Sequence, residues 1–228
     1  MKFFTPLLTL VAAGTIYANG ITDLLNNLNK RDNVETECDT REITDCITSP
    51  TVNSQEYLCQ KIKSDICQKF YADPFGVLPS CKNDTIFSKL FQPIVVNSTK
   101  QQYNLICQKD EAGNICPYGE ILLKEYSKVL NPISDKQREE LLKSTCQSKY
   151  CREATYRAFA DYDEARRTVK EATPGVIYNP KDNIIYIGKQ EVAKYMDTDE
   201  CKAMSDASTL KISTGFFISI GLLLLSLY

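Results

Sequence analysis

The sequence predicts a mainly α-helical domain that is cross-linked by disulfides and carries one small β-hairpin. Two observations predict this class: apolar residues recur at helical spacing in several segments, and ten cysteines are spread between residues 38 and 201 of the 228-residue chain. An even number of cysteines is typical of a disulfide framework in secreted proteins, so we expect five bonds. We expect both ends of the chain to be removed by processing, as argued from their sequences below. The length that remains suits one domain.

The N-terminal end predicts entry into the secretory pathway. Residues 1–20 fit a signal peptide, because Lys2 supplies a short basic region, an apolar run follows, and small residues precede the expected cleavage point. Residues 21–31 then fit a propeptide that ends at the dibasic pair Lys30-Arg31, which resembles the cleavage site of fungal kexin-type proteases. Two solvated charges on a flexible terminus are the alternative interpretation.

The C-terminal segment, residues 205–228, fits the signal for attachment of a glycosylphosphatidylinositol (GPI) anchor. Ser205 or Asp206 is the expected attachment residue, within a triplet of small residues that precedes a polar spacer and an apolar tail starting at Phe216. The tail is shorter than the roughly 20 apolar residues that a membrane-spanning helix needs. The ectodomain is therefore expected at residues 32–204.

The first part of the ectodomain contains two predicted helices joined by a turn. The first covers residues 36–47, and proline with small polar residues ends it. In the second, which Ser54 caps, apolar residues recur every four positions from Leu58 to Phe70. Helices joined by so short a turn pack antiparallel.

The cysteines of these two helices predict a pair of disulfides. Both helices carry cysteines eight positions apart, which places each pair on nearly one helix face. This spacing favours a ladder with Cys46–Cys59 near the turn and Cys38–Cys67 at the open end, and the segment resembles the stapled helical hairpin of twin-cysteine proteins. More distant partners for each cysteine are the alternative. The other cysteines stay unassigned: Cys81, Cys107, Cys116, Cys146, Cys151 and Cys201.

The rest of the ectodomain predicts further helices and the hairpin. A loop at 73–80 and a turn or two of helix at 85–92 precede a helix at 118–130. The strongest helix starts at a capping box, Ser134 with Gln137, and continues to Ala172.

After that helix, β-branched and aromatic residues flank a five-residue loop of turn formers, which predicts a β-hairpin at residues 176–187. A short helix at 190–196 then leads to Cys201, which we expect to fasten the end of the domain.

Two sequons, at Asn83 and Asn97, predict N-glycosylation of a secreted chain. Chance occurrence is the alternative. No catalytic, cofactor or metal site is predicted, since the chain has no histidine, which removes the usual triads and zinc ligands. A net charge of −2 argues against nucleic acid as a partner.

The order of these parts resembles that of fungal GPI-anchored, cysteine-rich cell-surface proteins. The resemblance implies a glycosylated lipoprotein on the outer face of the plasma membrane or in the cell wall. The membrane is then a partner through the lipid anchor, and a wall glycan or surface protein is a second one. We therefore expect a structural or interaction role, and no enzyme.

Two alternative functions stay open. The segment from Leu141 to Cys146, with Cys151 following, resembles oomycete elicitins, which implies an extracellular lipid- or sterol-binding module with an apolar cavity between helices.

The other alternative is a carboxylate-dependent glycan hydrolase. Asp161, Asp163 and Glu164 form the densest acidic cluster, and glycosidases need only two carboxylates. The same cluster also suits a solvated helix face, on which Asp163 pairs with Arg167 four positions later.

Overall fold

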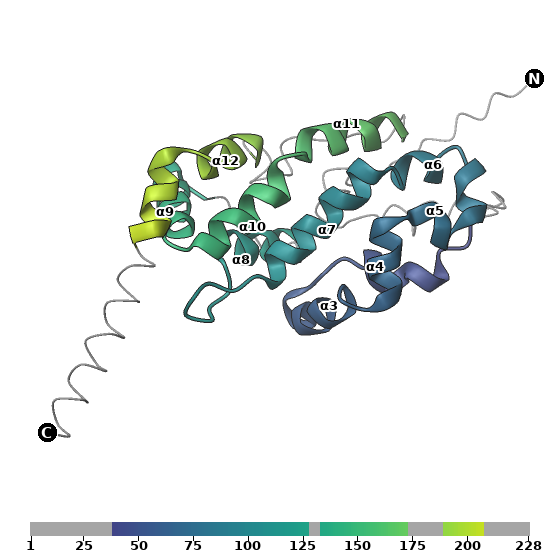
Figure 1. Cartoon of the computed structure of the whole chain (residues 1–228), viewed down its shortest axis with the longest axis horizontal. Coiled ribbons are helices and arrows are strands. Elements are labelled where there is room, and N and C mark those ends of the chain that lie inside the picture. Colours follow the sequence, from purple (N-terminus) through teal and green to yellow (C-terminus); the bar gives the residue numbers. More distant parts are fainter. Residues whose placement is uncertain (1–37, 128–132, 173–188, 208–228) are drawn as a thin grey trace, which may run out of the picture.

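The computed structural model describes residues 38–127, 133–172 and 189–207 (Figure 1). Within these ranges the chain is built from helices, and extended pairing is limited to an isolated bridge. The prediction of a mainly α-helical, disulfide-stapled domain is confirmed. The hairpin predicted at 176–187 lies outside the described residues, as do the expected signal peptide, propeptide and apolar tail.

We divide the described chain into an N-terminal region, residues 38–92, and a C-terminal region, residues 93–207. The N-terminal region consists of short elements: η2 (Arg41–Ile43), α2 (Thr44–Ile47), η3 (Val52–Ser54), α3 (Gln55–Lys61), α4 (Asp65–Ala72), α5 (Pro74–Val77), η4 (Pro79–Asn83) and α6 (Phe87–Leu90). The C-terminal region has mostly longer helices: α7 (Pro93–Cys107), α8 (Pro117–Tyr126), α9 (Asp135–Cys146), α10 (Lys149–Phe159), α11 (Tyr162–Ala172) and α12 (Lys189–Met196). Residues 199–207 are also helical.

Helix α7 lies at the centre of the molecule. Figure 1 shows it between the short N-terminal helices and α10 to α12, and it packs against α3, α4, α8, α10 and α11. Pro93 occupies its first turn, where a missing N–H is not needed and the fixed φ suits a helix. Buried side chains cover much of its surface: Val95, Val96, Ser98, Gln102, Tyr103, Leu105 and Ile106.

Helix α8 approaches α7 closely because Gly119 lies at their contact. A Cβ atom at this position would overlap the carbonyl oxygen of Leu105 and would lie 3.4 Å from Cα of Ile106. The obstacle is backbone rather than a flexible side chain, so the two helices meet at this spacing only with glycine.

Tyrosines from two other helices hold the segment that contains α2. The Tyr71 hydroxyl donates to the carbonyl oxygen of Cys46 at 2.7 Å, and the Tyr103 hydroxyl donates to that of Ile47 at 3.2 Å. Burial raises the pKa of both phenols above the ordinary value, so both remain donors at neutral pH. The short helix is therefore fixed by tertiary bonds.

Five disulfides cross-link the helices. They comprise two bonds within the N-terminal region, two within the C-terminal region and one that joins the regions. The pairs, in that order, are Cys38–Cys81 and Cys46–Cys67, Cys116–Cys151 and Cys146–Cys201, and Cys59–Cys107.

The ladder predicted for the four N-terminal cysteines is wrong in both bonds, Cys38–Cys67 and Cys46–Cys59. The prediction assumed one continuous second helix, but a turn at residues 62–64 divides it into α3 and α4. Cys59 and Cys67 therefore lie on different helices and meet different neighbours. Cys38 lies in coil before the first helical turn, so it does not share a helix face with Cys46.

The long helix predicted from residue 134 to 172 has the predicted start but is three helices. Both bonds of the capping box form, since the Gln137 side chain accepts from Ser134 N–H at 2.8 Å and Ser134 Oγ accepts from Gln137 N–H at 3.3 Å. Ser148 then caps a new helix, α10, by accepting from Cys151 N–H at 3.1 Å. Cys146 and Cys151 consequently reach different neighbours, Cys201 and Cys116.

Candidate functional site

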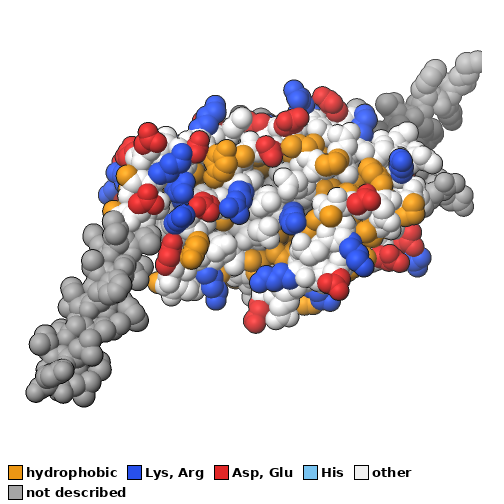
Figure 2. Space-filling view, viewed as in Figure 1, with side chains coloured by type: hydrophobic (Ala, Val, Ile, Leu, Met, Phe, Trp, Pro, Cys, Tyr) orange, Lys and Arg blue, Asp and Glu red, His pale blue; other side chains and the backbone are white. Residues whose placement is uncertain are grey.

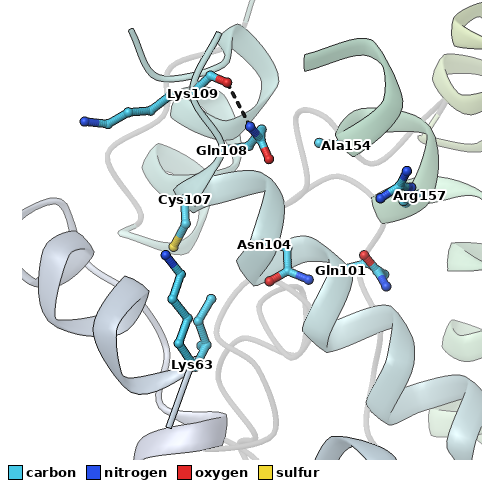
Figure 3. A pocket seen from close by; sticks show the side chains of 9 residues that line it. Lys63, Gln101, Asn104, Cys107, Gln108, Lys109, Ala154 and Arg157 are labelled. Carbon is cyan, nitrogen blue, oxygen red and sulfur yellow. Dashed lines mark hydrogen bonds between the residues drawn. The ribbon is translucent and has the colours of Figure 1, made fainter. Parts of the chain in front are cut away.

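A cleft opens between the turn after α3, the C-terminal half of α7 and the middle of α10 (Figure 3). Its volume is about 380 Å³, a size in the range of small-molecule sites. We call it the polar cleft, and its lining residues are Ile62, Lys63, Gln101, Asn104, Cys107, Gln108, Lys109, Ala154 and Arg157.

The junction of α3 with the end of α7 positions one wall of the polar cleft. The disulfide Cys59–Cys107 ties the two helices together, with Cα atoms 5.5 Å apart. Across the same junction, Gln55 Nε2 donates to the carbonyl oxygen of Ile106 at 2.8 Å. Lys63 lies just beyond α3, so its position follows from how these bonds hold that helix.

The polar cleft is lined by cations and amides, and no carboxylate is among its lining residues. Arg157 Nη2 lies 3.3 Å from Glu153 Oε2. Lys63 and Lys109 form no ion pair with any acid in the described part of the chain. A lining of this kind suits a ligand that carries carboxylate, sulfate or phosphate groups, because charge-assisted hydrogen bonds are the strong ones.

The same lining does not suit a sterol. Ile62 and Ala154 are its aliphatic members, whereas sites for apolar ligands are lined mostly by hydrophobic and aromatic side chains. The elicitin-like alternative therefore gains no support from the polar cleft.

A second polar cluster is enclosed where α8, α11 and α12 meet. Lys189 is 1% exposed, and its Nζ lies 3.3 Å from Glu125 Oε2 and 3.5 Å from Oε1. The ammonium also lies 4.5 Å from the centre of the Tyr162 ring and 5.7 Å from that of Phe159. A buried cation needs such compensation, so we assign this cluster to packing.

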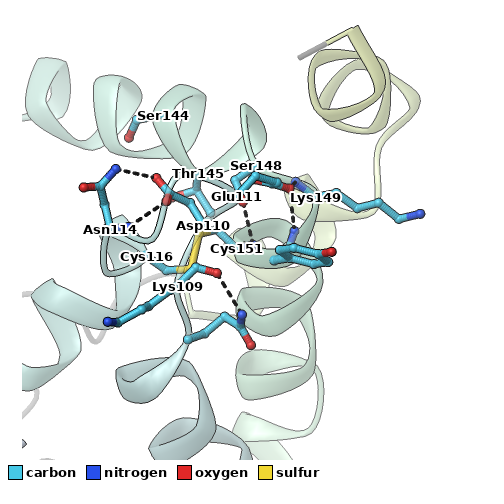
Figure 4. The surroundings of a disulfide bond; sticks show 12 residues. Lys109, Asp110, Glu111, Asn114, Cys116, Ser144, Thr145, Ser148, Lys149 and Cys151 are labelled. Carbon is cyan, nitrogen blue, oxygen red and sulfur yellow. Dashed lines mark hydrogen bonds between the residues drawn. A yellow bond between two sulfur atoms is a disulfide. The ribbon is translucent and has the colours of Figure 1, made fainter. Parts of the chain in front are cut away.

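The turn between α7 and α8 contacts the start of α10 (Figure 4). Gly113 takes a φ of 88° in this turn, which favours glycine. Glu111 Oε1 accepts from the backbone N–H of Lys149 at 3.0 Å and of Tyr150 at 3.4 Å. Burial alone would raise the pKa of Glu111, but hydrogen bonds from Ser148 and from these N–H groups outweigh it and lower the pKa. The carboxylate thus stabilises the positive end of α10.

The two predicted glycosylation residues lie in different backbone settings. Asn83 is exposed as the last residue of the short η4, and the next two residues of its sequon lie in coil and a turn. Asn97 is also exposed, but it lies inside α7, and its Oδ1 accepts from Gln101 Nε2 at 3.4 Å.

The two expected attachment residues also differ. Ser205 is fully buried within the helix at 199–207, and its Oγ donates to the carbonyl oxygen of Lys202 at 2.7 Å. Asp206 is exposed on the same helix. Its exposure therefore favours Asp206 over Ser205 as the attachment residue.

The acidic cluster proposed for hydrolysis is exposed around the first turn of α11, where Asp161, Asp163 and Glu164 all face solvent, outside the polar cleft. Asp163 and Arg167 do not form the expected pair in this part of the structure. Among the described residues, no group of three or more Cys, Asp or Glu could hold a metal ion.

The sequence did not predict the polar cleft, because it did not predict α7. A signal was present: Gln101 and Asn104 are three residues apart, which places both amides on one face once the helix is recognised, and Gln108 follows directly after the helix.

No protein-family model, curated protein or solved structure matches this chain. None of the described helices is long and apolar enough to cross a bilayer. On the face seen in Figure 2, basic and acidic side chains are interspersed.

Proposed function

We propose that this protein is a GPI-anchored, N-glycosylated component of the cell surface or cell wall, with a structural or interaction role and no catalysis. The observation that carries the proposal is the pairing of all ten cysteines in five disulfides. Such bonds persist in oxidising, extracellular surroundings. The hydrophobic ends of the sequence, which fit a signal peptide and an attachment signal, support the same location.

The disulfides also support a role that demands durability. Their sequence separations run from 21 to 55 residues. In the chain-entropy treatment, loops of this size each contribute about 3 to 4 kcal/mol by restricting the unfolded chain. A domain stabilised in this way resists unfolding and proteolysis outside the cell.

Asp206 is the attachment residue that we propose, in place of Ser205. The attaching enzyme must reach the carbonyl carbon of the residue, and Asp206 is exposed where Ser205 is buried. The bond Cys146–Cys201 fixes the chain shortly before this point. The anchor would then hold the folded domain close to the membrane.

Treatment of intact cells with a phosphatidylinositol-specific phospholipase tests the anchor. We expect the protein to appear in the medium with ethanolamine phosphate on Asp206, detected by mass spectrometry. A matched control is a chain truncated after Ser208, which should be secreted without treatment. Retention on cells together with an intact apolar tail would contradict the proposal.

Glycosylation is tested in the same preparation. We propose that Asn83 is occupied to a greater extent than Asn97, because the sequon of Asn83 leaves η4 for coil and a turn, whereas that of Asn97 lies wholly inside α7. Peptide mapping after deglycosylation in heavy-oxygen water measures both occupancies. Equal or reversed occupancy would contradict this ranking.

A further inference from the structure

One of the five disulfides differs from the others in exposure. Cys59 and Cys107 are both half-buried, whereas the other eight cysteines are buried, with exposed fractions from 0% to 6%. Thiol–disulfide exchange requires that an attacking thiolate reach a sulfur atom, so exposure separates reactive from inert bonds. Cys59–Cys107 therefore joins the two most exposed of the ten cysteines.

The surroundings of this bond favour attack by a thiolate. Cys107 lines the polar cleft together with Lys63 and Lys109. Figure 3 shows the Lys63 side chain extending toward the Cys107 sulfur. Positive charge nearby stabilises a thiolate, both the one that arrives and the one that leaves.

The position of the bond allows it to open without loss of the fold. Each region keeps its own two disulfides, and Cys59–Cys107 is the one of the five that joins them. The hydrogen bond from Gln55 Nε2 to the Ile106 carbonyl oxygen also spans the junction. Opening would therefore loosen α3 against α7 while both regions stay folded.

We propose that Cys59–Cys107 is a thiol–disulfide exchange site, and that the polar cleft admits a small anionic thiol to it. The thiolate sulfur attacks Cys107 Sγ, the bond between Cys107 and Cys59 breaks, and Cys59 leaves as a thiolate that takes a proton from water. The product carries one mixed disulfide on Cys107 and one thiol on Cys59, so no other oxidant or reductant is consumed. The cations of the cleft hold the acidic group of the incoming thiol. This site is independent of the proposed anchor.

Limited reduction of the folded protein, purified from the cell surface, tests the site. The probes are 2-sulfanylethanesulfonate, which is anionic, 2-mercaptoethanol, which is neutral, and cysteamine, which is cationic. Reactions are stopped with iodoacetamide and mapped by mass spectrometry. We expect Cys59–Cys107 to open at least about tenfold faster than any other bond, since access governs exchange.

The charge of the cleft predicts an order among the probes. The anionic thiol should react fastest relative to its reactivity toward a model disulfide, although the whole chain has a net charge of −2. The double variant Lys63→Gln/Lys109→Gln should lower the ratio of anionic to cationic rates severalfold. The matched control Lys69→Gln/Lys82→Gln changes net charge equally at exposed lysines outside the cleft, and should leave the ratio unchanged.

Each outcome decides the proposal. Circular dichroism before and after reaction confirms that the protein and its variants stay folded. Prior opening of a buried bond, simultaneous opening of all five, or a mixed disulfide on another cysteine would overturn the exchange site. Equal rate ratios in the cleft variant and the control would overturn the role of the cleft in admitting the thiol.

Discussion

The N-terminal and C-terminal regions are both helical, but their helices differ in length and in what stabilises them. The α-helices of the N-terminal region have between 4 and 8 residues, whereas α7 to α12 have between 8 and 15. Helices shorter than about 12 to 15 residues are marginal on their own. The N-terminal region therefore depends more on tertiary bonds for its local structure.

Different interactions stabilise the helices of each region. In the N-terminal region, two disulfides and two tyrosine hydroxyls act on elements of one or two turns. In the C-terminal region, caps begin α9 and α10, and the ion pair of Lys189 with Glu125 lies among packed rings. Each region has two internal disulfides, so the difference lies in the length of the helices that they hold. The short elements of the N-terminal region depend more on these cross-links than the longer, packed helices of the C-terminal region do.

The largest expected effect is on the packed C-terminal region. Lys189→Met leaves the Glu125 carboxylate buried without its cation, which should lower the free energy of unfolding by about 3 to 5 kcal/mol. Urea denaturation measures the change. The double variant Lys189→Met/Glu125→Leu should recover most of it, since an apolar replacement of a buried pair is often neutral. Full stability of the single variant would show that packing does not depend on this pair.

Removal of a disulfide tests the covalent side of the comparison. Cys46→Ser/Cys67→Ser should cost about 2 to 5 kcal/mol and remove hydrogen-exchange protection from α2 to α4 while α7 stays protected. The matched control is Cys146→Ser/Cys201→Ser, in which α9 and α10 should keep their protection. Chain entropy alone predicts the larger cost for the control, because its separation is 55 residues against 21. Equal loss of hydrogen-exchange protection in both variants would show that the two regions depend on their disulfides to the same extent.

The next largest expected loss of stability comes from disturbing the contact of α8 with α7 at the centre of the molecule. Gly119→Ala forces α8 away from the Leu105 carbonyl and should cost about 1 to 3 kcal/mol. The matched control on the same helix, Glu120→Ala, is exposed and should cost no more than about 0.5 kcal/mol. Thermal denaturation of both variants provides the comparison. If Gly119→Ala cost no more than the control, the contact between α8 and α7 would be able to shift and accept a larger side chain.

The smallest expected effect is the pH dependence of the stability that Glu111 contributes. The pKa of Glu111 is lowered in the folded protein, so its contribution is present above the unfolded value of about 4.3 and is lost as pH falls through the folded value. Glu111→Gln should cost about 0.5 kcal/mol at pH 7, after allowance for solvent screening, and nothing at the acidic end.

Urea titrations at several pH values measure this difference, with the exposed Glu171→Gln as the control. A gap between wild type and Glu111→Gln that is constant with pH would contradict the assigned role.

Helix starts were predictable from the sequence where a local signal decides them. The capping box at Ser134 needs only residues three apart, and it forms as predicted. The helix predicted at 85–92 stops just before Pro93, and no helix is predicted to begin there. Pro93 nevertheless begins α7, because proline suits the first turn of a helix as well as the position after its end. The central helix and the polar cleft were missed for that reason.

Disulfide pairing was not predictable from spacing. The prediction for Cys59 and Cys67 relied on one continuous helix, and a single turn after α3 redirected both cysteines. The apolar pattern does not reveal this break, because it continues through the turn to Phe70. The break depends on tertiary contacts, which bury Phe70 but leave Ile66 37% exposed. Which cysteine meets which is therefore decided by the packing of helices distant in sequence.

Disulfide mapping of the protein from the cell surface tests the central claim most directly. Proteolysis without reduction, followed by mass spectrometry, identifies each linked pair of peptides. We predict five linked pairs, with Cys46–Cys67 inside the N-terminal region and Cys59–Cys107 as the bond between regions. Recovery of Cys46–Cys59 or Cys38–Cys67, or of free thiols on the freshly purified protein, would contradict a fold in which two separately cross-linked regions share one accessible bond.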